Sequence, residues 1–276
     1  MHDRLDDNKF ALETGSHNLK KLFTAVLAVA AFGLVASSAS AGQKVRIGVE
    51  GAYPPFNSID PSGKLVGFDV DIANALCAAA KLDCEFVFPL AWDGMIPGLL
   101  AKKYDAIIAS MSITEERKKK VDFTRKYYNT PAKFVAPEGK NLTVTPEGLK
   151  GMSVAVQRAT THENFLRDNF SGLDIRVYAT QDEANADLVS GRVDLGHADS
   201  IALMEDFINT DAGKGFEFVG PDFNVPQWHG VGAGIAVRKG DDELRMALDK
   251  AIDQIRADGT YKAINAKYFD FDVFGE

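Results

Sequence analysis

Residues 45–81, VRIGVEGAYPPFNSIDPSGKLVGFDVDIANALCAAAK, contain the pattern that decides the fold. The β-branched run at 45–49 predicts a strand, which ends at Gly51 and the following Pro54–Pro55 pair. Helical periodicity then extends over residues 68–81. A strand that leads through a turn into a helix is the repeating unit of α/β folds.

The same alternation of strand-like and helix-like segments continues along the chain. Further strands are expected at 84–88, 105–109, 152–156, 175–178, 193–196, 216–219 and 231–238. Helices are expected at 95–102, from Thr114, at 182–190, at 201–207 and within 242–269. This alternation predicts α/β layers with mostly parallel sheets.

The segments group into two blocks, one before about Tyr128 and one from about Lys133 onward. The final strand and helices do not fit the second block, which indicates that the chain returns to the first. We therefore expect two lobes joined by two crossing segments, near residues 129–131 and 226–228.

The first 41 residues are typical of a secretory signal. Lys20 and Lys21 precede an apolar run at 22–35, and Ala39-Ser40-Ala41 provides an A-x-A cleavage motif. The apolar run is too short to span a bilayer comfortably, and no later stretch is long and apolar enough to do so. We expect cleavage after Ala41 and export to the periplasm.

The charge of the chain limits its partners. It has 31 basic and 39 acidic side chains, a formal net charge of −8, and no basic run after the leader. Such a composition argues against nucleic acid and anionic membranes as partners.

Cys77 and Cys84 are the only cysteines. In an exported protein, two cysteines seven residues apart most simply form one local disulfide. A metal-binding pair is the alternative, but no histidine lies near them in the sequence.

Polar residues follow several of the expected strands, and ligands of open α/β sheets bind at the carboxyl ends of strands. In the first block these residues are Glu50, Tyr53, Trp92, Asp93, Ser110, Met111, Ser112 and Arg117. In the second block they are Gln157, Arg158, Ala159, Thr160, Thr161, His162 and Asp199.

Three of these stretches carry a resemblance: GVEGAYPPF at 48–56, GFDVD at 67–71 and DAIIASMSITEER at 105–117. In this order they resemble the polar amino-acid family of periplasmic solute-binding proteins. Within that family the chain is most similar to the lysine/arginine/ornithine-, histidine- and opine-binding members. The similarity extends from Val45 to Glu276 and includes the cysteine pair. It implies the two-lobed type II periplasmic binding protein fold, in which two three-layer α/β lobes are joined by a two-segment hinge.

The resemblance also implies how an α-amino acid would be held. Arg117 matches the arginine that grips the ligand α-carboxylate, a role suited to a planar bidentate fork. Ser110 and Ser112 match residues that hold both α-groups, and Thr161 completes the capture of the carboxylate. Asp199 matches the acid that pairs with the α-ammonium.

At the other end, Tyr53 and Trp92 match an aromatic pair that flanks the ligand side chain, and Glu50 matches the acid that reaches its distal cation. Each position also has a purely structural interpretation. Asp199 is a possible helix cap, Trp92 a core residue, Glu50 a loop acid and Arg117 a solvated surface charge. The set taken together favours the binding role.

Five positions differ from the lysine/arginine/ornithine binders and resemble the opine-binding subgroup: Glu50, Trp92, Ala109, Gln157 and His162. Gln157 and His162 would then bond a second carboxylate, which opines have and lysine lacks. Gln157 could equally bond a guanidinium, so the choice between a cationic amino acid and an opine stays open.

The predicted organisation is a signal peptide at 1–41, a first lobe at 42–129 plus 231–276, and a second lobe at 130–230. The expected function is that of a monomeric binding component that closes on its ligand and delivers it to the permease of an ABC importer. We expect no catalytic residues, cofactor or metal. A dehydratase-like enzyme derived from the same fold is the alternative, with Glu50 or His162 as general acid.

Overall fold

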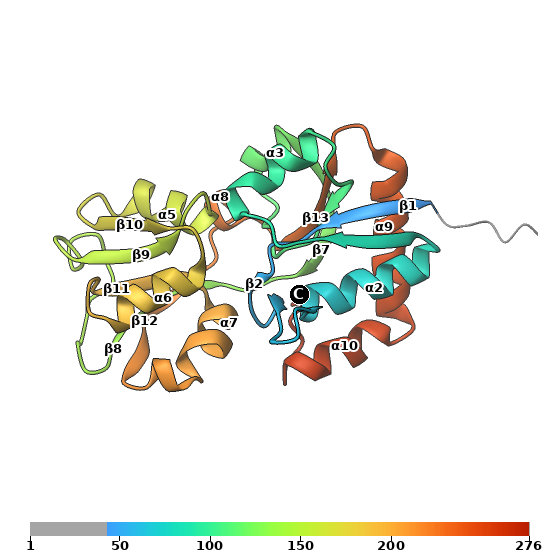
Figure 1. Ribbon diagram of the computed structural model, residues 1–276. Helices are drawn as coiled ribbons and strands as arrows, with labels where there is room; N and C mark the ends of the chain where they lie inside the picture. Colours follow the sequence, from blue (N-terminus) through green and yellow to red (C-terminus); the bar gives the residue numbers. More distant parts are fainter. Residues whose placement is uncertain (1–42, 276) are drawn as a thin grey trace, which may run out of the picture. The chain divides into compact units, whose positions relative to one another are not determined.

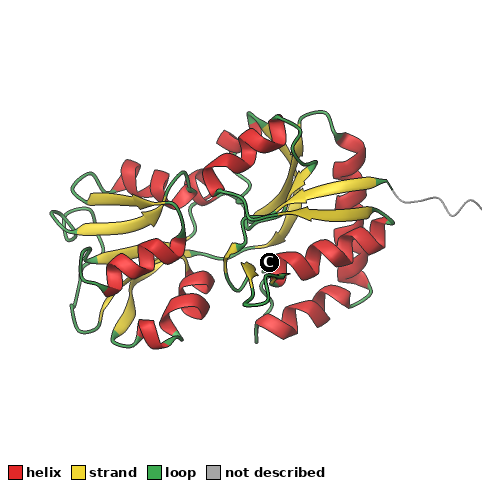
Figure 2. Ribbon diagram, in the orientation of Figure 1, coloured by secondary structure: helices red, strands yellow, loops and turns green. Residues whose placement is uncertain are grey.

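The computed structural model describes residues 43–275. The predicted leader and its cleavage site therefore lie outside the described residues. The described part of the chain forms two α/β lobes, each with its own five-stranded sheet and helices on both faces (Figures 1 and 2).

The sheet of the first lobe combines early and late parts of the chain. Across the sheet its strands are β5 (Asp83–Val87), β1 (Lys44–Gly48), β6 (Ala106–Ile107), β13 (Ala233–Arg238) and β7 (Val121–Tyr128). Strand β1 pairs in parallel with β5 and β6, whereas β13 is antiparallel to β6 and β7. A strand from the C-terminal part of the chain therefore lies inside this sheet.

The sheet of the second lobe is built from one continuous part of the chain. Across the sheet its strands are β10 (Asp174–Tyr178), β9 (Ser153–Gln157), β11 (Leu195–Asp199), β8 (Ala132–Pro137) and β12 (Phe216–Phe223). Strand β9 pairs in parallel with β10 and β11, and β8 is antiparallel to β11 and β12.

Both sheets are therefore mixed, and the expectation of mostly parallel sheets is wrong. In each sheet two of the four pairings are parallel and two are antiparallel. The antiparallel pairings arise because each lobe contains a strand that connects the two lobes and so enters its sheet from the other end. Local periodicity does not reveal this direction.

Alternating side chains of each central strand pack against different layers of helices. In the first lobe, Ile235 and Val237 face the core that is shared with α2 (Phe68–Ala80) and α9 (Asp242–Ala257), while Ala236 faces the core beside α3 (Met95–Leu100). In the second lobe, Val154 and Val156 face one core and Ala155 faces the other. This period of two produces three layers in each lobe.

The helices of the first lobe include two, α9 and α10, that form from the predicted C-terminal helical segment at 242–269. They are α2 (Phe68–Ala80), η1 (Trp92–Gly94), α3 (Met95–Leu100), α4 (Glu115–Lys118), α9 (Asp242–Ala257) and α10 (Thr260–Tyr268). Helix α9 buries Leu244, Leu248, Ile252 and Ile255, which recur at the spacing of one helix face.

The helices of the second lobe are shorter. They are α5 (Thr161–Asn169), α6 (Gln181–Val189), α7 (Ser200–Leu203), η2 (Met204–Ile208), η3 (Asp211–Gly213) and α8 (Pro226–His229). The predicted helix at 201–207 is therefore split into α7 and the π-helical turn η2.

A small third sheet was not predicted. It consists of β2 (Ala52–Tyr53), β3 (Asn57–Ile59) and β4 (Leu65–Val66), and it lies between β1 and α2 in the chain. Its strands are too short for an alternating pattern to be visible in the sequence.

The predicted disulfide is confirmed. Cys77 in α2 is bonded to Cys84 in β5, with the two Cα atoms 6.2 Å apart. It ties the end of a core helix to the edge strand of the first sheet.

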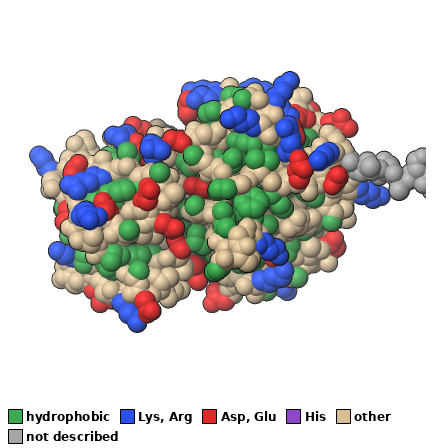
Figure 3. Space-filling view, viewed as in Figure 1, with side chains coloured by type: hydrophobic (Ala, Val, Ile, Leu, Met, Phe, Trp, Pro, Cys, Tyr) green, Lys and Arg blue, Asp and Glu red, His purple; other side chains and the backbone are tan. Residues whose placement is uncertain are grey.

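The chain passes between the two sheets twice, once from β7 to β8 and once from β12 through α8 to β13. Among residues 43–275, no helix has the length and apolar character needed to cross a membrane. On the face in Figure 3, basic and acidic side chains are interspersed, and several acidic ones lie along the line where the lobes meet.

Candidate functional site

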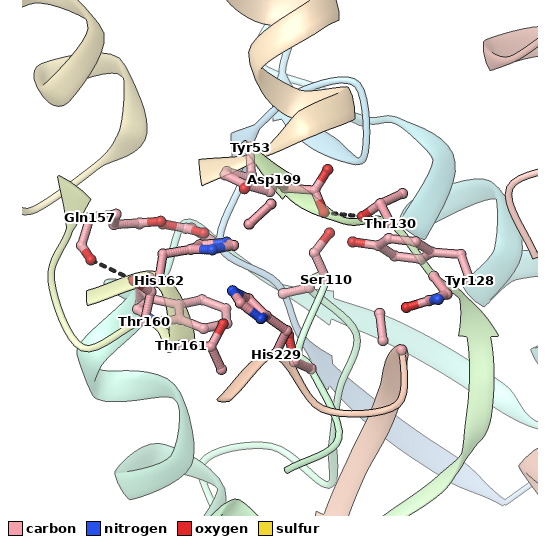
Figure 4. Close-up of a pocket in the computed structure, with 18 of the residues that line it drawn as sticks. Tyr53, Ser110, Tyr128, Thr130, Gln157, Thr160, Thr161, His162, Asp199 and His229 are labelled. Atoms are coloured by element: carbon pink, nitrogen blue, oxygen red, sulfur yellow. Dashed lines mark hydrogen bonds between the residues drawn. The ribbon is translucent and has the colours of Figure 1, made fainter. Parts of the chain in front are cut away.

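A cavity lies between the two lobes, near the carboxyl ends of β1, β9 and β11 (Figure 4). It encloses about 610 Å³ of space not filled by atoms, part of which is open to solvent. Twelve of the thirteen predicted binding residues line it: Glu50, Tyr53, Trp92, Ala109, Ser110, Ser112, Arg117, Gln157, Thr160, Thr161, His162 and Asp199.

Met111 is the predicted residue that the cavity does not include. Its side chain is buried with Met95, Leu99 and Ile113 in the core beside α3. Ser110 and Ser112 line the cavity, whereas the side chain of Met111 between them packs into the core.

The sequence reasoning missed seven residues that line the cavity: Tyr128, Asn129, Thr130, Ala132, His229, Gly232 and Ala233. All of them lie on or beside the two connections between the sheets. The expected crossings at 129–131 and 226–228 could have indicated these residues in the sequence, because a connection between two lobes has to pass along the cleft that separates them.

Arg117 is the only basic residue with a permanent charge among the described residues that line the cavity. It lies in the short helix α4, where its backbone N–H donates to the Thr114 hydroxyl that caps the helix. Its Nη1 donates to the Ser112 carbonyl oxygen at 2.9 Å, and its guanidinium carbon lies 5.3 Å from the centre of the Trp92 ring. Burial lowers its pKa to about 10, so the side chain remains charged at neutral pH.

Within the described residues, Arg117 has no carboxylate partner. Its hydrogen bond to the Ser112 carbonyl and the Trp92 face orient the guanidinium but leave its charge uncompensated. A guanidinium held in this way is suited to bind a carboxylate that enters the cavity.

Asp199 is the last residue of β11 and also the cap of α7. Its Oδ1 accepts hydrogen bonds from the backbone N–H groups of Ile201 at 3.0 Å and Ala202 at 3.4 Å, and its Oδ2 accepts one from the Thr130 hydroxyl (Figure 4). Burial raises the pKa of Asp199 to about 6, although these hydrogen bonds to the carboxylate oppose the shift. The capping interpretation and the cavity position are both confirmed for this residue.

Glu50 lies just beyond β1 and is 3 % exposed. Its Oε1 accepts a hydrogen bond of 2.6 Å from Nε2 of Gln157, which comes from the end of β9 in the other lobe. Burial raises the pKa of Glu50 to about 8, although the bond from Gln157 opposes the shift. A buried carboxyl without a cationic partner keeps its proton at neutral pH.

Aromatic side chains form part of the wall. Tyr53 is 8 % exposed, and Trp92 lies in the 3-10 turn η1. The Trp92 Nε1 donates to the Ala159 carbonyl oxygen at 3.1 Å, which is a second hydrogen bond between the lobes. An ion pair between Arg158 Nε and Asp93 Oδ2, at 2.9 Å, also joins the two lobes.

Ser110 is held by a buried acid that the sequence analysis did not single out. Its hydroxyl donates to Oδ2 of Asp69 at 3.0 Å, and the same carboxylate accepts bonds from Asn57 Nδ2 and the Tyr127 hydroxyl. Asn57 in turn accepts a bond from the N–H of Gly51, next to Glu50. The network fixes Ser110, whose φ of 55° is uncommon for a residue with a side chain.

The second lobe presents the start of α5 to the cavity. Thr160 caps this helix by accepting a bond from the Glu163 N–H, and its hydroxyl donates to the Gln157 carbonyl oxygen at 2.7 Å. Thr161 and His162 are the first two residues of the helix. The free N–H groups and partial positive charge of a helix start favour a negatively charged group nearby.

Comparison with known proteins gives a consistent picture. Residues 45–271 match the family model of bacterial extracellular solute-binding proteins, family 3. The L-arginine-binding protein of Pseudomonas aeruginosa is 50 % identical over 238 residues, which cover 86 % of this chain and 92 % of that protein. The histidine-binding periplasmic protein of Escherichia coli K12 is 42 % identical over 261 residues, covering 93 % of this chain and all of that protein.

A solved structure shows the same architecture. It is a Salmonella typhimurium periplasmic binding protein described as having high arginine specificity, which superimposes with a TM-score of 0.76 at 31 % identity. The match covers 83 % of this chain and 100 % of that chain.

Proposed function

This chain belongs to the bacterial extracellular solute-binding proteins, family 3, and from that premise we propose that it binds one arginine-type amino acid between its lobes. The charges in the cavity carry the proposal. Arg117, Glu50 and Asp199 are the charged or acidic side chains that line it, and none has an oppositely charged partner among the described residues. One guanidinium and two carboxyls complement a ligand with one carboxylate and two cations.

The α-groups of the ligand bind where the protein supplies matching partners. The α-carboxylate is placed between the Arg117 guanidinium and the start of α5 at Thr161, two groups that favour an anion. The α-ammonium is placed against Asp199, whose pKa burial raises and a cation would lower. Ser110, fixed by Asp69, completes the polar contacts.

The distal cation is placed against Glu50. Tyr53 and Trp92 then flank the aliphatic part of the ligand. The cation neutralises the buried Glu50 carboxylate, which without a cation is neutralised by a proton. Leaving this carboxyl beside a neutral ligand preserves its high pKa and yields no ion pair. The site therefore favours a ligand with a cationic end.

The bonding of Gln157 favours a guanidinium over the second carboxylate of an opine. Its amide N–H groups donate to Glu50 at 2.6 Å and to the Ala179 carbonyl at 3.2 Å, so its donors are already used. The remaining amide oxygen is an acceptor, which suits the N–H groups of arginine. An opine would have to displace one of these two bonds.

In this proposal the protein acts in the periplasm as the binding component of an ABC importer for amino acids. The relatives carry names of binding proteins, and the lobes of this chain contact each other through Glu50–Gln157 and Arg158–Asp93. The lobes comprise 42–129 plus 231–276 and 130–230. The protein works as a monomer, without a chemical step, and hands the ligand to a membrane permease.

Calorimetry on protein unfolded and refolded to remove co-purified ligand tests the proposal. The panel is arginine, lysine, ornithine, histidine, glutamine, octopine and nopaline. Arginine should bind most tightly, and glutamine at least about 100-fold more weakly, equivalent to about 2.7 kcal/mol. Preference for glutamine would contradict the cationic site, and tighter binding of octopine than arginine would favour the opine alternative.

A chromatographic control addresses the dehydratase-like alternative. The protein is incubated with each ligand that binds, and the mixture is separated after many hours. Every ligand should be recovered unchanged. Conversion of a bound ligand in proportion to protein concentration would show an enzyme.

A further inference from the structure

Residues 43–275 contain three histidines, and the fold brings all three together. His162 comes from the start of α5, His197 from β11 and His229 from the end of α8. One ring nitrogen of each lies within 4.8 Å of one ring nitrogen of each of the others. His162 and His229 also line the cavity, where Figure 4 shows both imidazoles, and His197 lies behind them in the core.

Four of the six ring nitrogens of this histidine cluster (His162, His197 and His229) are buried and have no hydrogen-bond partner among the described residues. This holds for Nδ1 of His162, both ring nitrogens of His197 and Nε2 of His229. His197 is 0 % exposed and His229 is 7 % exposed. Buried polar atoms in proteins are nearly always hydrogen-bonded, so unpaired nitrogens from three rings at one place point to a bound species. One ion would take one nitrogen from each ring and would therefore account for three of these four atoms.

The surroundings keep these rings neutral. His197 packs against Phe134 and Phe165, with ring centres 4.3 and 5.7 Å away, and Phe165 lies 4.8 Å from His229. Neutral imidazoles have the free lone pairs that a transition metal requires.

The spacing fits a metal ion after a small contraction. A tetrahedral zinc ion with Zn–N bonds of about 2.0–2.1 Å holds its nitrogens about 3.3 Å apart. Nitrogens at the corners of a triangle with sides of 4.8 Å would each move inward by less than about 1 Å to reach that geometry.

One hydrogen bond opposes the metal. His229 Nδ1 accepts a bond of 3.1 Å from the Val225 N–H, so in the metal-free ring the proton is on Nε2. Coordination through Nε2 would move that proton to Nδ1 and break the bond to Val225. Three metal–nitrogen bonds outweigh the loss of one hydrogen bond, whereas a single buried water would leave it intact.

We propose that His162, His197 and His229 bind one divalent transition-metal ion such as Zn²⁺, with a fourth coordination position that opens into the cavity. Three imidazoles with an open position form a site of known type for zinc. The proposal departs from the sequence-based expectation that no metal is bound. It does not depend on the identity of the amino-acid ligand.

Zinc titration of the secreted protein tests this site. The protein is purified without a polyhistidine tag, treated with a chelator and titrated with ZnCl₂ in a calorimeter, with no amino acid present. We expect one Zn²⁺ per chain with a dissociation constant below about 10 μM, on the order expected for an imidazole site. MgCl₂ should give no comparable heat, because Mg²⁺ prefers oxygen ligands. Bound Co²⁺ should show the visible absorption of a tetrahedral site.

Two variants identify the ligands. His229→Asn keeps an oxygen that can accept the Val225 N–H bond but lacks Nε2, and His197→Phe replaces a buried ring by one that suits its aromatic neighbours. Each should weaken Zn²⁺ binding by at least about 100-fold, equivalent to about 2.7 kcal/mol. Circular dichroism checks the fold of both variants. If His197→Phe does not fold, the Zn²⁺ affinity of His229→Asn alone tests whether the cluster binds the metal.

Two outcomes would overturn the proposal. One is the absence of Zn²⁺ binding by the unsubstituted protein, which would assign the cluster to a buried water. The other is unchanged Zn²⁺ affinity in folded His229→Asn, which would place the ion elsewhere. Arginine binding, measured separately in chelator-containing buffer, reports on the proposed transport function, so the two ideas fail independently.

Discussion

The two ends of the cavity hold their charges in different ways. At one end, the Arg117 guanidinium is oriented entirely by its own lobe, through the Ser112 carbonyl, the Trp92 face and the cap of α4. At the other end, the Glu50 carboxyl has a partner from the opposite lobe, Gln157. The Arg117 guanidinium is therefore oriented before the lobes meet, although Thr161 of the second lobe completes the proposed anion site, whereas the Glu50 carboxyl gains its partner only by their contact.

This difference separates two tasks. A cation that is ready in one lobe can capture the carboxylate that every α-amino acid has. A carboxyl that is buried on contact with the other lobe tests whether the ligand has a second cation, because burial is unfavourable for an unpaired carboxylate. In the proposed function, capture would be general and selection would take place when the lobes close.

Arg117→Ala should produce the largest effect. It removes the cation that we propose binds the α-carboxylate, so the affinity for arginine and for glutamine should fall by at least about 1,000-fold, or about 4 kcal/mol. Calorimetry with both ligands measures this loss, and thermal unfolding serves as the check on the fold. Near-normal affinity for either ligand would remove Arg117 from the site.

Glu50→Gln should affect only ligands with a distal cation. Arginine affinity should fall about 10- to 100-fold, or about 1.4–2.7 kcal/mol, because the ion pair is lost while the shape of the side chain is kept. Glutamine should bind as well as before or better. An equal loss for both ligands would show that the two ends do not divide capture from selection.

The pH dependence of arginine binding should report on Glu50. Its raised pKa of about 8 means that the carboxyl without a cation holds a proton below pH 8, which arginine has to displace. Affinity should therefore fall as the pH decreases from 8 to 6, by up to about tenfold per pH unit. His197 and His229 stay neutral throughout this range because burial keeps their pKa values near 3 and 4.

The Glu50→Gln variant is the matched control for this titration. It should show a nearly flat profile for arginine between pH 7 and pH 8, since Asp199, whose pKa burial raises to about 6, changes its charge only at lower pH. A slope that persists in the variant would assign the proton to another group, such as Asp206, whose pKa burial raises to about 7.

Trp92→Phe should produce the smallest effect. It keeps an aromatic ring beside Arg117 but removes the Nε1 bond to the Ala159 carbonyl of the other lobe. One such hydrogen bond contributes about 1 kcal/mol, so all ligands should lose about fivefold in affinity. Calorimetry at one pH is sufficient, and a loss confined to arginine would place Trp92 in selection rather than closure.

The sequence predicted most of the fold because its signals are local. The two-lobed α/β fold, the family and the Cys77–Cys84 disulfide are confirmed. The strand at 45–49 and the helix at 68–81 match β1 and α2 within a residue at each end. By contrast, the mixed direction of the sheets depends on where β13 and β8 insert, and periodicity carries no information about that.

The same reasoning explains the gaps in the predicted site. Strand-end positions such as Glu50 and Asp199 are visible in the sequence, because chemistry follows the strand directly. Partnerships that join distant segments, such as Asp69 with Ser110 or His229 with His197, have no local signature. The predicted roles of the individual binding residues remain predictions for the experiments above.

The position of β13 has a consequence for how the protein is made. This strand, Ala233–Arg238, lies between β6 and β7, yet it is translated after every strand of the second sheet. As the chain emerges from the export channel, strands β8 to β12 can all pair with one another while the first sheet still lacks β13 between β6 and β7. The second lobe is therefore the part that can fold early, whereas the facing edges of β6 and β7 stay unpaired until β13 has emerged.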